Sequence, residues 1–279
     1  MVSGSSAPAG FDRARYLDRI GATAPVRADL AALGFLMRAH LDRVPFENLD
    51  VQLGRVPPET VDDIFDKVVN RGRGGWCYEV NTLFGVLLAD LGYAVTRLSG
   101  DVRRGGDVAE RPGNHLCLRV DLDRAYLVDV GFGGSTTTPI AIERGRVVDG
   151  PYAIHMVQVA SDRWTFDETV GEGASFGFDF TTRPADEGIL AAMRSALACE
   201  DWSPFVQNLV MQLRRGDTHW TLRGRVLTQL TPDGKTTRLL ESADEMAAVG
   251  REVFAIELPE VARLWRRAAD RHDQLFGTG

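Results

Sequence analysis

The sequence predicts an α+β protein, because helical and strand-like repeats occupy different parts of the chain. From Phe11 to Leu91 the apolar residues recur at helical spacing. After Gly92 their period changes to two, in short runs separated by Gly, Asp and Pro, and beyond Pro184 the two patterns alternate. The expected segments are a disordered leader over 1–10, a helical bundle over 11–95, an antiparallel sheet or barrel over 96–185 and a mixed α/β segment over 186–279.

Four helices are expected in the first segment. Each shows apolar side chains three or four positions apart, and the third begins with prolines and acidic residues that favour a first helical turn. The fourth opens near Cys77 and ends before Gly92. The expected ranges are 11–20, 26–44, 57–72 and 77–91.

Seven short alternating runs predict the strands of the central segment. They cover 93–103, 115–122, 125–132, 146–150, 153–160, 163–170 and 175–180. The last segment is expected to contain a helix over 185–200, a hairpin over 219–240 that turns at Asp233-Gly234, and a C-terminal helix over 258–276.

The composition is that of an ordinary soluble globular protein, with 44% hydrophobic and 25% charged residues. A net charge of −7 opposes general binding to nucleic acid or to anionic membranes, and no apolar run approaches the roughly 20 residues of a membrane span. Cys77, Cys117 and Cys199 lie far apart and form no CxxC pair, which fits neither a disulfide framework nor a metal site. We therefore expect a cytoplasmic protein without a metal.

Cys77 stands in the stretch "RGGWCYEVN", directly after a Gly-Gly turn and at the start of a helix. Gly74 and Gly75 permit a close backbone approach that a Cβ would hinder. The helix N-terminus favours a thiolate, and a nearby histidinium favours it much more. A cysteine in apolar surroundings is more commonly a small buried hydrophobe, and we interpret Cys117 and Cys199 as core or incidental residues. Catalysis by Cys77 therefore requires a histidine partner.

Of the five histidines, His115 is the best candidate partner. It begins a strand immediately after the turn-like "ERPGN", where a ring can reach a cleft. His40 and His272 lie in amphipathic or charged helices and are expected at the surface. His155 lies within a strand, and His219 has no neighbouring feature that supports a role.

Asp129 is expected to orient the His115 ring. It stands between Val128 and Val130, which indicates burial, and a buried carboxylate needs a hydrogen-bond partner. Positions 115 and 129 have the same parity, so they share a face of the hairpin only if its connection has three residues or a bulge. We expect such a connection, because a two-residue turn at Asp123-Arg124 would place the side chains on opposite faces.

Four motifs in order, "VPFENLD", "RGGWCYEVN", "NHLCLRV" and "YLVDVGFGG", resemble those of the arylamine N-acetyltransferase family. The resemblance covers nearly the whole chain after the leader. It implies a helical bundle, a β-barrel and an α/β lid, with a catalytic core like that of papain-type proteases and transglutaminases. It also implies a Cys-His-Asp triad of Cys77, His115 and Asp129.

The activity implied by this resemblance is a two-step acetyl transfer. Acetyl-CoA would acetylate Cys77, and a small arylamine or arylhydrazine would then take the acetyl group while His115 removes its proton. Backbone N–H groups near Cys77 would form the oxyanion hole. Small molecules, not nucleic acids or membranes, are thus the expected partners.

Further positions carry over from the family motifs. Phe46, Phe132 and Phe205 match aromatics near the acceptor, although each is also compatible with ordinary core packing. Gly113 and Asn114 fall where relatives contact the cofactor, with Asn114 departing from the usual Thr or Gly. Arg73, Glu79 and Asn81 are interpreted as structural, with an Arg-Glu pair bracing the turn. The basic stretch 100–107 is interpreted as a solvated loop, with contact to the CoA phosphates as the alternative.

Three other functions remain open from the sequence. An amide synthase that closes macrolactams could use the same triad on a long acyl chain. A cysteine hydrolase would resolve the thioester with water. A non-enzymatic binding module could retain the fold, although all three triad residues are present.

Overall fold

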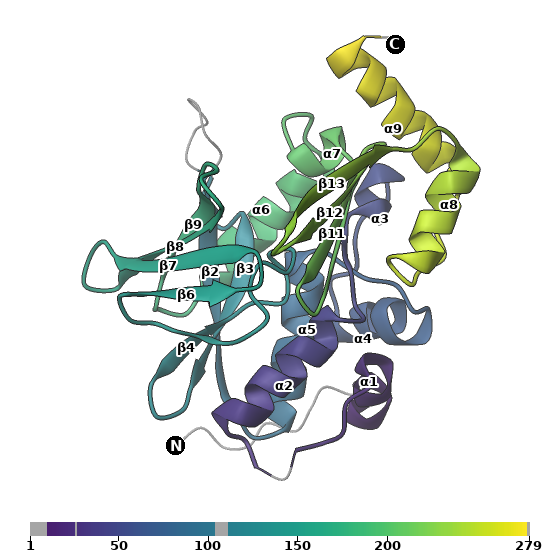
Figure 1. Cartoon of the computed structure of the whole chain (residues 1–279). Helices are drawn as coiled ribbons and strands as arrows, with labels where there is room; N and C mark the ends of the chain where they lie inside the picture. Colours follow the sequence, from purple (N-terminus) through teal and green to yellow (C-terminus); the bar gives the residue numbers. More distant parts are fainter. Residues whose placement is uncertain (1–9, 26, 104–110, 278–279) are drawn as a thin grey trace.

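The computed structural model describes residues 10–25, 27–103 and 111–277. Almost all of the predicted leader and the second half of the basic stretch 100–107 lie outside the described residues. The chain has an α+β fold with two antiparallel sheets (Figure 1). Within the described residues, no helix has the length and apolar character needed to cross a membrane.

The helices begin and end where local capping groups stand. Asp12 and Asp29 accept hydrogen bonds from the first turns of α1 and α2, and Gly21 ends α1 in the left-handed conformation. The helix predicted over 57–72 begins only at Val61, capped by Thr60, and passes into a π-helical turn. The helical elements of the described residues are α1 (Arg13–Ile20), α2 (Leu30–Leu41), α3 (Leu49–Gln52), α4 (Val61–Phe65), η1 (Asp66–Asn70), α5 (Cys77–Asp90), α6 (Glu187–Cys199), α7 (Pro204–Gln207), α8 (Ala243–Glu252) and α9 (Val261–Phe276).

The central segment forms an eight-stranded antiparallel sheet with the order β5-β4-β3-β2-β9-β8-β7-β6. Its strands are β2 (Ala94–Val102), β3 (His115–Asp121), β4 (Ala125–Val128), β5 (Ile140–Ala141), β6 (Gly145–Asp149), β7 (Tyr152–Gln158), β8 (Arg163–Val170) and β9 (Phe176–Thr181). The strand predicted over 125–132 ends at Val128, because the next amides bond to side chains: Val130 N donates to Asn81 and Gly131 N to Asp129. The edge strand β5 was not predicted, since two residues show no period.

The smaller sheet has the order β1-β10-β11-β12-β13 and joins distant parts of the chain. Its strands are β1 (Phe46–Glu47), β10 (Val210–Arg215), β11 (Thr218–Arg223), β12 (Val226–Thr231) and β13 (Gly234–Leu239). The hairpin expected over 219–240 is present as β12 and β13, which turn at Pro232-Asp233, within one residue of the predicted turn. The sequence missed a second hairpin in the same stretch, which joins β11 to β12 where Gly224 takes a positive φ. Strand β1 comes from the helical first third, so the structure crosses the segment boundaries that the sequence suggested.

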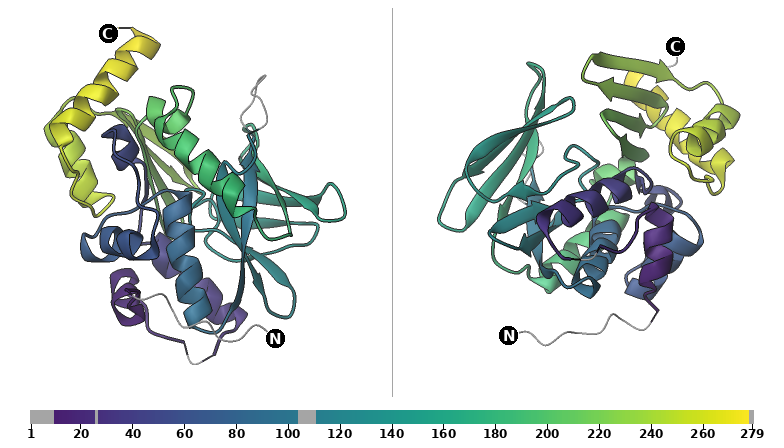
Figure 2. Two further views of the ribbon diagram at one scale, coloured as in Figure 1. Left: turned by 180° about the vertical axis from the view of Figure 1, so that it is seen from behind. Right: turned by 60° about the horizontal axis from the view of Figure 1, so that its bottom comes forward.

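Separate apolar cores hold these layers together. One lies between the N-terminal helices and strands β3 and β4, and another between the smaller sheet and helices α8 and α9 (Figure 1). Figure 2 shows from behind that α6 lies along the eight-stranded sheet, where Arg97 of β2 pairs with Glu187. A further core joins α6 to Phe46, Trp76, Cys77 and Leu116, and it therefore surrounds the candidate nucleophile.

The expectation that His40 lies at the surface was wrong. Its ring is fully buried, and Nδ1 lies 2.7 Å from the Tyr16 hydroxyl. Burial lowers the pKa of His40 to about 3, so the ring is neutral at physiological pH. His40 therefore belongs to the helical core and has no charge to offer elsewhere.

Candidate active site

The turn before Cys77 is pressed against the strand that carries Phe46. A Cβ on Gly74 would lie 2.0 Å from the Pro45 carbonyl oxygen, which no side chain can tolerate. Gly75 exchanges backbone hydrogen bonds with this strand, donating to Pro45 at 3.2 Å and accepting from Glu47 at 3.0 Å. The two glycines thus permit the close approach that the sequence suggested.

Cys77 is the first residue of α5, and its side chain is buried. The Glu79 carboxylate accepts the Trp76 backbone N–H at 3.1 Å and so fixes the start of the helix. On the far side, the Tyr78 hydroxyl donates to the Gly113 carbonyl oxygen. The nucleophile is therefore held between two anchored neighbours and at the positive end of a helix dipole.

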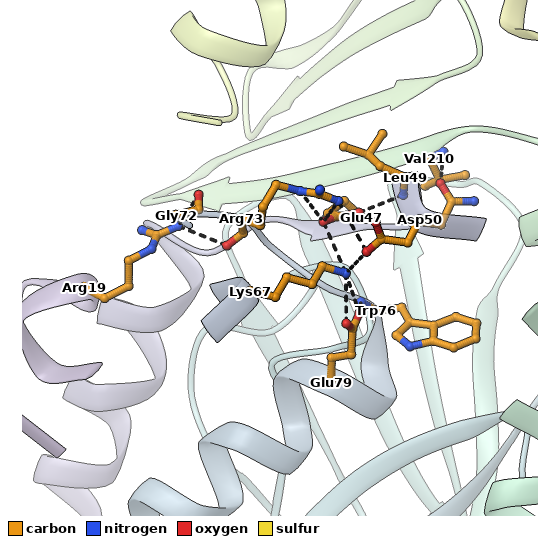
Figure 3. A network of polar contacts seen from close by, with 11 residues as sticks. Arg19, Glu47, Leu49, Asp50, Lys67, Gly72, Arg73, Trp76, Glu79 and Val210 are labelled. Carbon is orange, nitrogen blue, oxygen red and sulfur yellow. Dashed lines mark hydrogen bonds and ion pairs between the residues drawn. The ribbon is translucent and has the colours of Figure 1, made fainter. Parts of the chain in front are cut away.

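A buried ionic cluster lies next to this turn (Figure 3). Lys67 Nζ lies 2.6 Å from Asp50, 2.9 Å from Glu79 and 3.6 Å from Glu47. Arg73 Nη2 lies 2.7 Å from Glu47 Oε1 and 3.6 Å from Asp50. We call these five residues the ionic cluster. The arginine of the motif thus pairs with Glu47, while Glu79 pairs with Lys67.

The ionic cluster contains three carboxylates and two cations, and this excess of negative charge affects the pKa values of its members. Burial by itself would lower the pKa of Lys67, but the three carboxylates outweigh it and raise that pKa. Burial raises the pKa of Glu79 to about 7, although Lys67 opposes the shift. The cluster therefore ties β1, η1 and the start of α5 together through charges that have almost no solvent to screen them.

The hairpin that carries His115 and Asp129 has the expected connection. In the register Asp121 faces Ala125, so three residues link β3 to β4. Leu118 faces Val128, which places residue 129 diagonally across from His115 on the same face. The side chains meet accordingly, with His115 Nε2 2.6 Å from Asp129 Oδ2.

His115 is poised as an imidazolium beside Cys77. Burial disfavours its charge, but the Asp129 carboxylate and hydrogen bonds to Asp129 and Cys77 outweigh burial and raise the pKa of His115 to about 10. Since Nε2 bonds Asp129, Nδ1 is left for the thiol. The structure thus brings the nucleophile, base and orienting carboxylate of the sequence hypothesis into one contact chain.

Asn81 and Gly131 set the position of Asp129. The Asn81 amide donates to Asp129 Oδ1 at 2.8 Å and to the Leu116 carbonyl oxygen at 2.7 Å. Gly131 N also donates to Asp129 Oδ1 at 2.8 Å. A Cβ on Gly131 would lie 2.6 Å from Cys77 Cα, so this glycine lets the aspartate loop approach the nucleophile.

Protonation of His115 can be followed directly. We expect its ring to remain protonated to about pH 10, because Asp129 stabilises the imidazolium. The folded pKa lies above the unfolded value of about 6.5, so this pair contributes full stability below that value and loses it as the pH rises through 10. NMR of ¹⁵N-labelled histidine measures the transition. A midpoint near 6.5 in the wild type would contradict the expected ion pair.

A cavity of about 370 Å³ opens onto Cys77 and His115. Phe46, Phe132 and Phe205, the aromatics that the family motifs suggested, all line it. The rings of Phe46 and Phe205 lie 6.0 Å apart, and the Phe132 ring lies 5.3 Å from that of His115. These aromatic walls suit a flat apolar substrate next to the thiol.

The two residues suggested for cofactor contact occupy different places. Asn114 lines the cavity, but its side-chain oxygen accepts the Val102 backbone N–H at 2.7 Å. Gly113 does not line the cavity; its N–H donates to Asp101 and its carbonyl accepts from Tyr78. Asn114 therefore lines the wall with its side chain bonded to the backbone of β2, whereas Gly113 lies outside the lining and anchors Tyr78.

The remaining cysteines and His219 do not line this cavity. Cys117 is buried in the core of the large sheet, and burial raises the pKa of its thiol. Cys199 is exposed at the end of α6, with Sγ 3.2 Å from the Ser195 carbonyl oxygen. His219 is buried, and its Nδ1 bonds the Tyr152 hydroxyl.

Sequence reasoning missed Arg223 at the end of β11. It lines the cavity, and within the described part of the chain it is the only lysine or arginine that does so. No ion pair of the described residues involves Arg223. The position of Arg223 depends on the pairing of β10 with β1, which no local pattern signals.

The chain is similar to proteins of known family. A family model described as N-acetyltransferase matches residues 29–263. The chain is 36% identical to the arylamine N-acetyltransferase of Mycolicibacterium smegmatis, over 90% of this chain and 94% of that protein. The chain belongs to the arylamine N-acetyltransferase family. Enzymes of this family are acyltransferases, and so is this chain.

Two further relatives bear on the activity. The structure of Mycobacterium marinum arylamine N-acetyltransferase in complex with CoA superposes with a TM-score of 0.85 at 31% identity, covering 93% of this chain and 99% of that one. The proansamycin X synthase of Amycolatopsis mediterranei is 32% identical over 77% of this chain and 81% of that protein. The family therefore includes a relative solved with CoA and one named as a synthase.

Proposed function

We propose that the protein is an acetyl-CoA-dependent arylamine or arylhydrazine N-acetyltransferase that works through an acetyl-Cys77 thioester. The observation that carries the proposal is the contact chain of Cys77, His115 and Asp129 at the base of an aromatic-walled cavity. We place it in the cytoplasm, because its sparse cysteines suit a reducing compartment.

In the first half-reaction, the Cys77 thiolate attacks the acetyl carbonyl carbon of acetyl-CoA. The backbone N–H of Cys77, in the first turn of α5, donates a hydrogen bond that stabilises the developing oxyanion. The bond from the carbonyl carbon to the CoA sulfur then breaks, and the departing thiolate takes the proton of the His115 imidazolium. Asp129 keeps the neutral ring in the tautomer with hydrogen on Nε2.

In the second half-reaction, the amine nitrogen attacks the acetyl-Cys77 carbonyl. His115 Nδ1 accepts the proton that the nitrogen loses, and Cys77 leaves as a thiolate. The histidinium and thiolate are thereby restored together. Phe46 and Phe205 on one side and Phe132 on the other would hold the aromatic ring of the acceptor.

Arg223 is suited to hold the phosphates of the donor. It lies in the same cavity as the thiol, and a guanidinium binds phosphate oxygens in a bidentate manner. The adjacent Thr221 and Gln212 add polar groups to the same wall. We therefore assign the wall formed by β10 and β11 to the CoA moiety.

Replacing Arg223 by glutamine is expected to raise the KM for acetyl-CoA about tenfold while leaving kcat unchanged, since one charge-assisted contact is lost. S-acetylpantetheine, which lacks the nucleotide phosphates, should show the same KM with both proteins. Steady-state kinetics at saturating amine measure both values, with Arg238→Gln on the exposed strand β13 as the control. An equal rise for the two donors would count against phosphate recognition.

Intact-protein mass spectrometry tests the proposed function. After brief incubation with acetyl-CoA and no amine, the wild type and Cys199→Ser should carry one acetyl group, and Cys77→Ser none. Addition of an arylamine should discharge the adduct. A folded wild type that gains no acetyl group would refute the proposal.

Amide synthesis is the less favoured alternative. Its support is the similarity to proansamycin X synthase, whereas several arylamine N-acetyltransferases match more of the chain at higher identity. A long-chain acyl thioester that acylates Cys77 where acetyl-CoA does not would favour it.

A further inference from the structure

A second cavity, of about 350 Å³, lies on the other side of α7 from the active site. Pro204 and Phe205 of this short helix line the first cavity, and Val206 lines the second. The Gln52 amide donates to the Val206 carbonyl oxygen at 3.0 Å and holds this wall in place. The two cavities have no lining residue in common, so the second is a separate space.

More cations than carboxylates line the second cavity. Three guanidinium groups line it, from Arg55, Arg194 and Arg267, against the single carboxylate of Glu59. Arg194 lies 2.6 Å from Glu59, and Arg55 pairs with Glu260 outside the lining. Arg267 has no carboxylate partner among the described residues; its hydrogen bonds go to neutral oxygens.

The guanidinium of Arg267 is nevertheless held in a defined orientation. Its Nε donates to Gln52 Oε1 at 3.3 Å, and Nη2 donates to the Val206 carbonyl oxygen at 3.0 Å. These bonds to neutral acceptors fix the plane of the group but leave its charge in place. A guanidinium oriented in this way has little conformational entropy left to lose when it binds an anion.

The floor of the cavity is apolar. Val51 and Pro57 are buried there, and Ala198 and Val206 are half-buried. Val56 at the rim leaves 79% of its surface exposed. An apolar floor beneath an unbalanced set of guanidinium groups matches a ligand with an apolar body and an anionic group.

We propose that this cavity binds a small amphipathic anion, namely an aromatic or short aliphatic body that carries a carboxylate, sulfonate or phosphate. The anionic group bonds Arg267 and Arg194, and the body covers Val51, Pro57 and Val206. This assignment does not depend on the acetyl-transfer activity proposed above.

Cys199 provides a local reporter, because its exposed thiol lines the second cavity whereas the Cys77 thiol lines the first. The experiment measures iodoacetamide alkylation of each cysteine by peptide mass spectrometry, with 1-naphthalenesulfonate as the probe. At a probe concentration ten times its Kd, alkylation of Cys199 is expected to slow roughly tenfold by mass action. The uncharged 1-naphthalenemethanol should protect Cys199 much less.

Arg267→Gln is expected to raise the Kd of the probe, as measured by protection of Cys199, roughly tenfold. Arg267→Lys should raise this Kd less, because the charge is kept. Arg266→Gln, one position away on the same helix and outside the cavity lining, is the matched control. Because Arg267 also holds Val206, Arg194→Gln provides a second variant on a different helix. Equal protection in all variants, equal protection by the uncharged probe, or protection of Cys77 without Cys199 would overturn the proposal.

Discussion

Asp129→Asn is expected to reduce the rate of Cys77 acetylation about 10⁴-fold, as loss of the orienting carboxylate does in comparable triads. Asn81 and Gly131 both donate to Oδ1, so the oxygen of an asparagine would face them and its NH₂ would face His115. His115 Nε2 would then have to accept, leaving hydrogen on Nδ1, which faces Cys77. A ring in this tautomer cannot take the proton of the thiol.

Quenched single-turnover acetylation, followed by intact mass, measures this rate. Asp121→Asn is the matched control, since that exposed carboxylate ends β3 in the same hairpin and bonds only Arg119 among the described residues. A thermal unfolding curve should show that both variants are folded. A loss smaller than about tenfold would remove Asp129 from the proposed mechanism.

Lys67→Met is expected to lower the free energy of unfolding by about 3–5 kcal/mol, the range for breaking a buried ion pair from one side. The methionine fills a similar volume, so the cost comes mainly from electrostatic repulsion among three buried carboxylates that lose their shared cation: Glu47, Asp50 and Glu79. With Lys67 removed, Arg73 is the only remaining cation of the ionic cluster.

Urea denaturation of the wild type and the variant, with Lys235→Met as the exposed control, measures this loss. Lys235 lies in the fully exposed strand β13, and its replacement should change stability by less than about 0.5 kcal/mol. The Glu79 pKa of about 7 lies above its unfolded value, so its protonation stabilises the fold as the pH falls. Lys67 lowers this pKa in the wild type, so its removal raises the Glu79 pKa further, and protonation stabilises the variant more than the wild type. The loss in Lys67→Met should therefore shrink between pH 8 and pH 6. A loss below about 1 kcal/mol would show that the cluster does not stabilise the turn.

Much of the candidate site could be predicted from the sequence, because its signals are local. The Gly-Gly pair and the apolar run after it place Cys77 at a tight turn and a helix start. The parity of His115 and Asp129 required a three-residue or bulged connection in the hairpin, and the register contains three residues. Such features depend on neighbours within a few positions, where spacing and residue type act directly.

Other features followed only from the tertiary structure. The pairing of β1 with β10 brings Phe46 and Arg223 into one cavity, and packing of the helices buries His40, which the helical pattern placed at the surface. Local spacing likewise gave no sign that Arg73 would pair with Glu47 or that Arg267 would meet Arg194. Contacts between distant segments depend on how the whole fold buries apolar surface and pairs charges, which local spacing does not show. The reactive groups and the local elements that carry them could thus be read from the sequence, whereas the cations and aromatics around them depend on tertiary packing.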